Sequence, residues 1–238
     1  MILTIDFGNS RVKVGVFHQQ QMVYHAAFDK FTLAEVKKIF NLFADIEKCI
    51  ISNVVDVSAA IDKFISSKAT LIYLNSTTLL PIKNKYKTPA TLGKDRLAVS
   101  CGAFNILGKQ NILVINCGTC ITYDFINSKK EYLGGSISLG LEMRCKALNY
   151  FTQKLPLIKI KNIDYLIGND TESSIIAGVV NGTVAEIKGV IKNYKKKYLS
   201  LQVVITGGDA EFLAKHFKNC IFAPHLTLIG LHSIINHS

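Results

Sequence analysis

The chain carries one local pattern twice: an apolar strand that ends in a short polar turn containing glycine, followed by a second apolar strand. The first copy is the opening stretch MILTIDFGNSRVKVGVF, with the turn Asp6-Phe7-Gly8-Asn9-Ser10. The second copy has the turn Asn116-Cys117-Gly118-Thr119. Because both turns follow the first strand of their half of the chain, we expect a duplicated fold and not a solenoid of short repeats.

The first half predicts strands and helices in the order βββαβαβα from its hydrophobic spacing. The predicted strands are 2–6, 12–18, 22–27, 49–53 and 70–74, and the predicted helices are 32–43, 57–66 and 93–107. A loop with two prolines precedes the last helix.

The second half repeats this order. The predicted strands are 111–116, 121–126, 131–137 and 202–206, and the predicted helices are 141–151, 171–196 and 209–216, before a closing strand and helix. The stretch 171–196 reads as one long helix or as two with a break near Gly182 or Gly189. We therefore expect an α/β protein of two domains, residues 1–108 and 109–238.

The composition favours a soluble globular protein. Of the 238 residues 49% are hydrophobic and 19% charged, which excludes a disordered or fibrous chain. We expect no secretory leader, and no apolar stretch of the length that a membrane span needs. Six cysteines without small-domain spacing suit a reducing compartment, so the expected location is the cytoplasm.

The net charge of +11 fits nucleic acid, a membrane surface or an anionic substrate such as ATP. The densest cluster, residues 192–197 with the sequence KNYKKK, closes a predicted helix. It is either a solvated helix end, where the dipole favours cations, or a contact for an anion. With only three arginines, base-reading DNA recognition is disfavoured.

The first turn has the chemistry of a phosphate-binding hairpin. Gly8 allows positive φ and a close backbone approach, and Ser10 and the turn N–H groups can hold phosphate oxygens. Asp6 ends the first strand, where its carboxylate can hold a metal-bound nucleotide. The competing interpretation is an ordinary hairpin with a polar turn.

The second turn offers hydroxyl groups from Thr119 and Thr122 and an open backbone at Gly118. Its Cys117 and Cys120 form a Cys-x-x-Cys, which we interpret as structural because it lies between strands and not at a helix N-terminus. Further on, Gly207-Gly208 follows a buried strand and opens a helix. Two glycines there let a flat ligand such as adenine lie against the backbone, although a plain strand-to-helix turn has the same sequence.

The segment Gly93-Lys94-Asp95-Arg96 opens a helix. Asp95 has a simple role as a partner of the helix dipole. It could also accept the proton of a substrate hydroxyl that attacks a phosphate, with Arg96 binding a substrate carboxylate through two hydrogen bonds. The segment 168–171 predicts helix capping by Asp170 or Thr171. The six histidines show no metal-ligand spacing and are expected to be structural or surface residues.

Taken in order, these motifs resemble the type III pantothenate kinase family, within the actin, Hsp70 and sugar-kinase superfamily. The resemblance covers nearly the whole chain and rests on seven segments: Asp6 to Ser10 with Lys13, Tyr86 with Gly93 to Arg96, Asn116 to Thr119, Gly134 to Leu141, Leu155-Pro156, Gly168 to Thr171, and Thr206 to Ala210. It implies duplicated actin-like (ribonuclease H-like) domains with an ATP cleft between them. It also implies phosphorylation of pantothenate by ATP, the first step of coenzyme A biosynthesis.

The resemblance further implies roles for individual residues. Asp95 would be the general base. The implied ATP-binding residues are Asp6, Gly8, Asn9, Ser10, Lys13, Gly118, Thr119, Gly207 and Gly208. The implied substrate-binding residues are Tyr86, Gly93, Lys94, Asp95, Arg96 and Thr171, the last contributed across the interface of a homodimer. Asp6 would hold Mg²⁺ through ATP, and Asn116 would contact a monovalent cation, K⁺ or NH₄⁺.

Three positions depart from the family pattern. Asn116 stands where an aspartate is usual, so this ligand lacks the negative charge that favours a bound cation. Leu139 stands where proline is usual, and Ser10 replaces threonine with its hydroxyl kept. Two other functions stay open: a catalytically impaired relative that binds ATP or pantothenate, motivated by Asn116, and a nucleic-acid-binding transcriptional accessory factor, motivated by the basic charge of the chain. No helix-turn-helix or basic-aromatic stripe supports the second.

Overall fold

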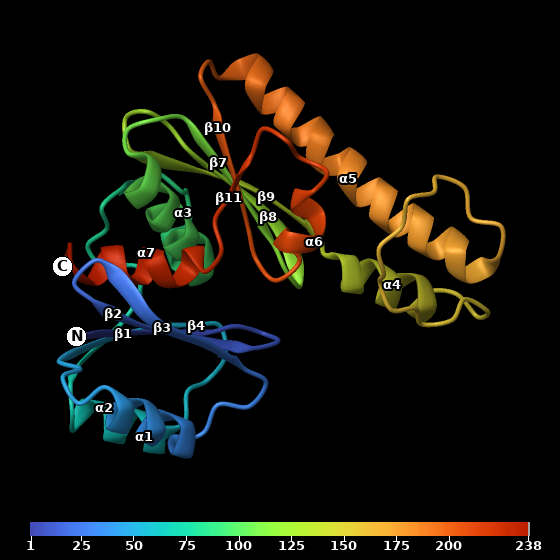
Figure 1. Cartoon of the computed structure of the whole chain (residues 1–238). Coiled ribbons are helices and arrows are strands. Elements are labelled where there is room, and N and C mark those ends of the chain that lie inside the picture. The colour runs from blue at the N-terminus through green and yellow to red at the C-terminus, as the bar shows by residue number, and fades with distance from the viewer. Residues whose placement is uncertain (238) are drawn as a thin grey trace. The chain divides into compact units, whose positions relative to one another are not determined.

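The computed structural model describes residues 1–237 and forms two compact units (Figure 1). Unit 1 contains residues 1–109, 129–133 and the C-terminal stretch from His225, and unit 2 contains residues 110–128 and 134–224. Each unit is described by itself. The predicted domain division after residue 108 stays a prediction, and the compact units place the C-terminal helix in unit 1.

Unit 1 is built on a five-stranded sheet with the strand order β3-β2-β1-β4-β5. Its strands are β1 (Ile2–Phe7), β2 (Val12–His18), β3 (Gln21–Phe28), β4 (Lys48–Asn53) and β5 (Thr70–Tyr73). The first three are antiparallel neighbours, and β4 and β5 run parallel to β1. The predicted order of three strands followed by alternating helices and strands is confirmed for β1 to β5.

Helices cover both faces of this sheet. On one face, α1 (Leu33–Leu42) and α2 (Ala59–Ser66) share a buried core with alternate residues of β1 and β2, among them Leu3, Ile5 and Val14. On the other face, α7 (Leu226–Ile235) contacts β1, β2 and β4 (Figure 1). The alternation of side chains along each strand thus supplies two apolar faces, one for each helical layer.

The helix α3 (Lys94–Leu107) packs directly on α7 through glycines. A Cβ atom at Gly102 would lie 2.4 Å from the carbonyl oxygen of Leu226, and one at Gly230 would lie 1.7 Å from that of Ala98. Only glycine allows two backbones to approach so closely. This contact holds the C-terminal helix in unit 1.

Unit 2 contains a sheet with the order β11-β10-β7-β8-β9. Its strands are β7 (Ile112–Cys117), β8 (Cys120–Ile126), β9 (Glu131–Leu139), β10 (Gln202–Thr206) and β11 (Ile221–Phe222). The first residues of β9 belong to unit 1, where Glu131 pairs with Lys83 of the short strand β6 (Lys83–Asn84). Neither β6 nor the 3₁₀ turn η1 (Pro89–Thr91) was predicted, because elements of two or three residues carry no periodicity.

The helices of unit 2 are α4 (Leu141–Tyr150), α5 (Thr171–Lys197) and α6 (Ala210–Ala214). Of the two interpretations of residues 171–196, the single helix is confirmed. A Cβ at Gly182 or Gly189 would meet no atom within 4 Å, so neither glycine marks a close contact. One face of α5, including Ile175, Val179 and Ile187, packs into the core of the unit.

Among the described residues, α5 alone is long and apolar enough to cross a membrane by length and composition. This corrects the expectation that no stretch reaches that length. Half of the apolar window is buried inside the structure, and the core helix of a globular protein meets the same test.

Candidate functional site

The first polar turn joins β1 to β2 in unit 1. The N–H of Gly8 donates to the carbonyl oxygen of Arg11 at 3.2 Å, and a Cβ at Gly8 would lie 3.1 Å from that oxygen. Gly8 does not use the positive φ that glycine allows, since among described glycines only Gly108, Gly134 and Gly207 have positive φ, and the close approach of a phosphate to its backbone stays a prediction. The tight turn closed by this bond needs the space of glycine and not its left-handed conformation.

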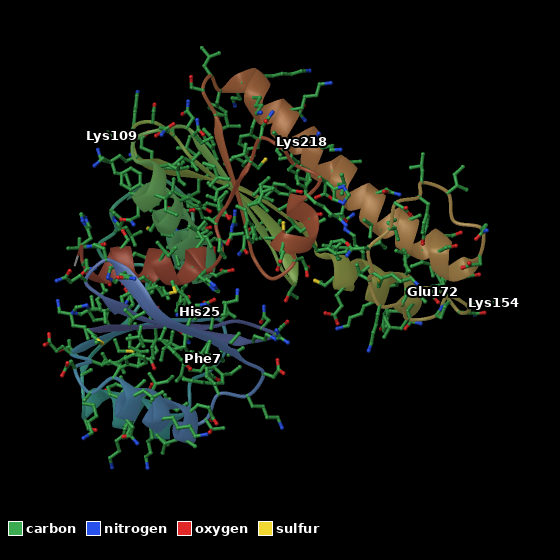
Figure 2. The ribbon with its side chains drawn as sticks, viewed as in Figure 1. Phe7, His25, Lys109, Lys154, Glu172 and Lys218 are labelled. Atoms are coloured by element: carbon green, nitrogen blue, oxygen red, sulfur yellow. The ribbon has the colours of Figure 1, made fainter. Side chains whose placement is uncertain are left out.

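Asp6 has a buried carboxylate and lies near the end of β1. It directly precedes Phe7, the last residue of that strand, which is labelled in Figure 2. It pairs in register with Lys13 on β2 and with Ser52 on β4. Burial raises the pKa of Asp6 to about 6, against the lowering effect of Lys13, and the carboxylate of Asp95 raises it further. Asp6 and Asp95 are therefore near enough to interact through their charges.

Asp95 lies in the first turn of α3, where Gly93 is the N-terminal cap residue. A Cβ at Gly93 would lie 2.6 Å from a carboxylate oxygen of Asp95. Because Gly93 has no side chain, the Asp95 carboxylate can occupy the space beside it.

The neighbours of Asp95 are fixed by contacts within unit 1. The buried guanidinium of Arg96 lies 5.9 Å from the ring centroid of Tyr86, in a cation–π arrangement. Lys94 donates from Nζ to the Oδ1 of Asn53 at the end of β4, at 2.8 Å. Asn53 was not predicted; its place at a strand end beside a helix start was the available signal.

Two histidines near Lys13 were also expected to have no more than a structural or surface role. The rings of His25 and His225 lie 4.1 Å apart between centroids, and His225, the N-cap residue of α7, has φ of 59° (Figure 2 labels His25). Burial, His25 and Lys13 lower the pKa of His225, so this ring is kept neutral beside the lysine. Nothing in the pair indicates a metal site.

The second polar turn lies in unit 2, where β7 extends one residue further than predicted and leaves only Gly118-Thr119 between the strands. Asn116 pairs in register with Thr122 on β8 and with Thr206 on β10. A Cβ at Gly118 would meet only one atom, 3.9 Å away. The position of the missing Cβ at Gly118 is therefore uncrowded.

The predicted Gly-Gly turn adjoins it. Gly207 has φ of +103°, and a Cβ there would lie 2.1 Å from the carbonyl oxygen of Cys117 and 2.7 Å from Oδ1 of Asn116. The N–H of Asp209 donates to the same carbonyl at 2.9 Å. Gly208 is exposed, and nothing lies within 4 Å of its Cβ position. The structure thus brings Asn116, Gly118 and Gly207 together at one edge of the sheet.

The start of α4 lies against the same turn. The N–H of Gly140 donates to the carbonyl oxygen of Thr119 at 3.1 Å, and a Cβ at Gly140 would lie 2.1 Å from that of Gly118. The hydroxyl of Thr122, predicted to be available, donates instead to the buried carboxylate of Asp124 at 2.9 Å. No role was predicted for Asp124, although its alternation with Thr122 along β8 placed both on one face.

The first cysteine of the Cys-x-x-Cys pair has a raised thiol pKa. Burial, with Asp209, raises the pKa of the Cys117 thiol to about 12, the opposite of a reactive cysteine. The Sγ of Cys120 contacts the Sδ of Met143 at 3.8 Å. All six cysteines are free thiols, and residues 1–237 hold no group of three or more metal-ligating side chains.

The predicted capping at residues 168–171 is confirmed. Asp170 is the N-cap of α5 and accepts from the N–H of Ser173 at 2.8 Å. Thr171 begins the helix and lines a cavity of about 1150 Å³, whose other walls include Leu148, Phe151 and Arg144.

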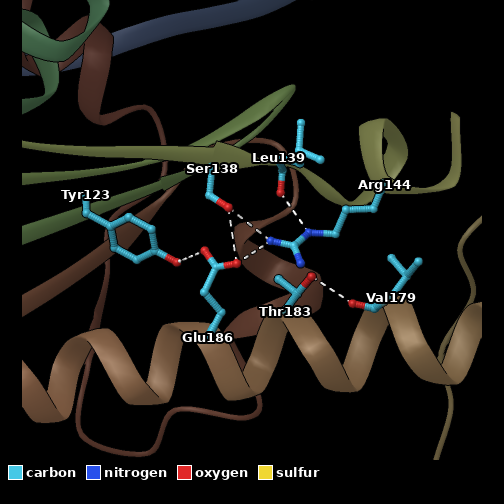
Figure 3. A network of polar contacts seen from close by, with 7 residues as sticks. All are labelled: Tyr123, Ser138, Leu139, Arg144, Val179, Thr183 and Glu186. Carbon is cyan, nitrogen blue, oxygen red and sulfur yellow. Dashed lines mark hydrogen bonds and ion pairs between the residues drawn. The ribbon is translucent and has the colours of Figure 1, made fainter. Parts of the chain in front are cut away.

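A polar network joins β8, β9 and α4 to α5 (Figure 3). Glu186 accepts from the hydroxyl of Tyr123 at 2.7 Å and from that of Ser138 at 3.1 Å, and pairs with Arg144. Partial burial raises the pKa of Glu186, and the hydrogen bonds from Arg144, Tyr123 and Ser138 outweigh it and lower the pKa overall. Arg144 also donates to the carbonyl of Leu139, so the network fixes the segment leading to Gly140. Sequence spacing gave no signal for the pairing of Arg144 with Glu186, which lie 42 residues apart in the chain.

Solved structures with this architecture identify the class of fold. They include a Baf family protein from Campylobacter jejuni that has been considered a transcriptional activator (TM-score 0.61, 21% identity, 98% of this chain and 97% of that chain covered). The others are the activator of 2-hydroxyisocaproyl-CoA dehydratase from Clostridium difficile with bound ADPNP (TM-score 0.55, 11% identity, 99% and 95% covered) and glucokinase from an Antarctic psychrotroph (TM-score 0.50, 12% identity, 100% and 99% covered). The chain has the actin-like fold of the ATPase and sugar-kinase class.

Sequence relatives narrow the class to one family. Residues 2–193 match the family model of type III pantothenate kinase. Curated type III pantothenate kinases from Christiangramia forsetii (41% identity, 99% of this chain and 98% of the relative) and Flavobacterium johnsoniae (41% identity, 94% and 92%) align over nearly the whole length. This protein belongs to the type III pantothenate kinase family and is a phosphotransferase.

Proposed function

We propose that this protein transfers the γ-phosphoryl group of ATP to the primary hydroxyl of pantothenate, giving 4'-phosphopantothenate at the first step of coenzyme A biosynthesis. The observation that carries the assignment is the group at the start of α3. There the Asp95 carboxylate occupies the space left by Gly93 and lies near Asp6, while Arg96 is buried against Tyr86.

Asp95 is the general base of this reaction. Its carboxylate accepts the hydroxyl proton of pantothenate as that oxygen attacks the γ-phosphorus and the bond to the β-phosphate oxygen breaks, releasing ADP. Arg96 binds the carboxylate of pantothenate through two parallel hydrogen bonds, since guanidinium geometry matches a carboxylate. Tyr86, Gly93 and Lys94 complete this side of the substrate site.

The nucleotide contacts come from the two turns. In unit 1, Asn9, Ser10, Lys13 and the backbone of Gly8 hold phosphate oxygens. In unit 2, Gly118 and Thr119 hold phosphate, and Gly207 and Gly208 lie against the adenosine.

Two carboxylates near each other fit Mg²⁺, which prefers oxygen ligands. Asp95 raises the pKa of Asp6, a repulsion that a divalent cation relieves. Bound with ATP, Mg²⁺ would supply positive charge against the phosphate oxygens. Asp6 would hold it through the nucleotide.

The experiment is a coupled ADP-release assay that offers pantothenate, simple sugars and acetate as acceptors. We expect turnover with pantothenate alone. Asp95→Asn keeps the shape of the side chain and removes the base, so turnover should fall at least about 100-fold while the circular dichroism spectrum stays unchanged. Wild-type turnover in Asp95→Asn would reject Asp95 as the base, and turnover only with another acceptor would reject pantothenate.

A second candidate is a relative with impaired turnover, and Asn116 favours it. Its amide oxygen lies at the Gly207 turn, where it can contact K⁺ or NH₄⁺, but it brings no negative charge. A K⁺ titration of turnover compares wild type with Asn116→Asp. Strong activation of the aspartate variant at low K⁺ would favour impairment, and equal curves would favour a fully active wild type.

The protein is further proposed to act as a cytoplasmic homodimer with Thr171 of each subunit completing the substrate site of the other. Around the cavity lined by Thr171, Tyr150 and Phe151 are 81% and 80% exposed, as expected for a face that a second copy covers. The free thiols of the described chain suit the cytoplasm. The nucleic-acid alternative gains no support from the arrangement of the described residues.

A further inference from the structure

A second cavity of unit 2, of about 290 Å³, lies between the C-terminal half of α5 and the segment that follows α6. Figure 2 labels Lys218, which belongs to that segment. Its polar lining consists of Lys188, Lys192, Lys195, His216 and Asn219, and Phe217 supplies apolar surface.

The three lysines lie on one face of α5, since they are spaced by four and three residues. The negative end of the helix dipole favours cations only in the last turn. Lys195 lies in that turn of α5, which ends at Lys197, but Lys188 and Lys192 lie one to two turns earlier. The dipole therefore does not account for them.

The charges of these lysines have no ion-pair partner among residues 1–237. Elsewhere in unit 2, Lys146 pairs with Glu142 and Lys161 pairs with Glu172, each at 2.7 Å. Among the described residues, none of the three cavity lysines forms an ion pair, and no aspartate or glutamate lines the cavity. Like charges at this spacing repel one another, which a bound anion would relieve.

The segment after α6 adds polar groups to the cavity. Burial lowers the pKa of His216, and Lys215 and Lys188 lower it further, so Lys188 acts on this ring directly. The Nε2 atom of His216 is buried and has no hydrogen-bond partner among the described residues. The amide of Asn219 offers two further N–H donors.

The cavity is distinct from the nucleotide residues of unit 2. The Gly207 turn follows the last residue of β10, whereas α5 leads through a short loop into the first residue of that strand, Gln202. None of the residues assigned to ATP lines this cavity.

We propose that this cavity binds a phosphate group, held by Lys188, Lys192 and Lys195 with the donors of the segment after α6. Its volume admits the anion and a compact organic body, for which Phe217 and Ile191 provide contact. Part of the lysine-rich end of α5 is thus a contact for an anion, while Lys197 lies instead over the ring of Tyr198.

The test follows the ring NMR signals of His216, assigned by their loss in His216→Gln, during titration with inorganic phosphate or phenyl phosphate. Sodium chloride at matched ionic strength is the salt control. The test variant is Lys188→Gln/Lys192→Gln/Lys195→Gln. The matched variant Lys68→Gln/Lys109→Gln/Lys196→Gln removes the same charge from exposed lysines outside the cavity. Glutamine and lysine have similar helix propensity, so the test variant should fold.

We expect saturable shifts in the wild type and the matched variant, no shift with chloride, and affinity at least tenfold weaker in the test variant. Tighter binding of phenyl phosphate than of phosphate assigns the cavity to an organic phosphate, and equal affinity assigns it to the free anion. Absence of a saturable shift in the wild type, or equal affinity in the test variant, overturns the proposal. If circular dichroism shows that the test variant misfolds, the same phosphate titration of the single variant Lys192→Gln replaces it, with the same outcomes for and against the proposal.

Discussion

At the scale of single residues, the candidate site depends on the absence of a Cβ atom at Gly93. Gly93 has an ordinary φ of −55°, so its role is not conformational freedom. The place of its Cβ lies 2.6 Å from the Asp95 carboxylate, which is the far end of a flexible side chain. An added methyl group would therefore move the carboxylate and leave the fold intact.

Gly93→Ala is expected to lower kcat about 100-fold, because a shift of about 1 Å in a reacting group has an effect of that size. Its unfolding midpoint in urea should stay close to that of the wild type. Steady-state kinetics and urea unfolding check this, and Gly182→Ala, whose added Cβ has nothing within 4 Å, is the control for adding a methyl group away from the site. Unchanged kcat in Gly93→Ala would show that Asp95 tolerates displacement.

A second prediction at this scale concerns Asp6, whose pKa burial raises to about 6 from the usual 3.8, with Asp95 adding to the shift. The folded state then binds the proton more tightly than the unfolded state, so ionised Asp6 reduces stability above pH 6 by about 3 kcal/mol. Asp6→Asn should raise the free energy of unfolding at pH 8 by up to about that amount. The gain should shrink as the pH falls from 6 to 4.

The same substitution should abolish kinase activity, because Asn cannot supply the charge that holds the metal-bound nucleotide. In the wild type, kcat/KM should fall below about pH 6 as Asp6 becomes protonated. Urea titrations at several pH values and a pH–rate profile check both. A less stable Asp6→Asn at pH 8 would contradict the buried-charge explanation.

At the scale of elements, α3 and α7 pack closely because each has a glycine at the contact, Gly102 on α3 and Gly230 on α7. Gly230→Ala would place a Cβ 1.7 Å from the carbonyl oxygen of Ala98, a backbone atom that cannot move alone. We expect a loss of about 3 kcal/mol or more in the free energy of unfolding. Since α3 carries Asp95, activity should fall as well.

Gly189→Ala on α5 is the matched control. It also adds a methyl group to a helix interior, but nothing lies within 4 Å of the new atom. It should stabilise the protein by about 0.5–1 kcal/mol through the difference in helix propensity. Equal effects of the two substitutions in urea unfolding would rule out the close helix contact as the cause.

At the scale of the whole molecule, the proposed homodimer makes a prediction about mixed subunits. Asp95→Asn removes the base, and Thr171→Arg fills the cavity that Thr171 lines, so each variant alone should be nearly inactive. If every site takes its base from one subunit and Thr171 from the other, a mixed dimer contains one intact site. Refolding the variants together at equal amounts should restore about a quarter of wild-type activity.

The control is the same mixture combined without exchange of subunits, which should stay inactive. Light scattering of the wild type should give twice the 26.3 kDa mass of the chain. A monomeric active wild type, or a mixture without recovery, would reject the shared site.

Much of the architecture could be predicted because it depends on local pattern. The apolar runs of β1 and β2 and the periodicity of α5 are properties of consecutive residues, and their bounds were correct to within one or two positions. The roles proposed for Asp95 and the Gly207 turn came from motif order in the same way. What could not be predicted depends on distant residues: the Arg144–Glu186 network, the Lys94–Asn53 bond and the packing of α7 on α3 join positions far apart in the chain.

The sequence by itself determined the elements, their duplicated order and the family to which the chain belongs, because short-range periodicity and motif order are written in neighbouring residues. Only the tertiary structure decided why particular glycines are needed. Gly93 leaves space for the Asp95 carboxylate, and Gly230 leaves space for the backbone of α3. Gly207 has positive φ and lies close to the carbonyl oxygen of Cys117, whereas Gly8 needs no positive φ. The sequence shows only that a glycine has no side chain. The reason why that position needs glycine is the atom that the fold brings close to the position of the missing Cβ.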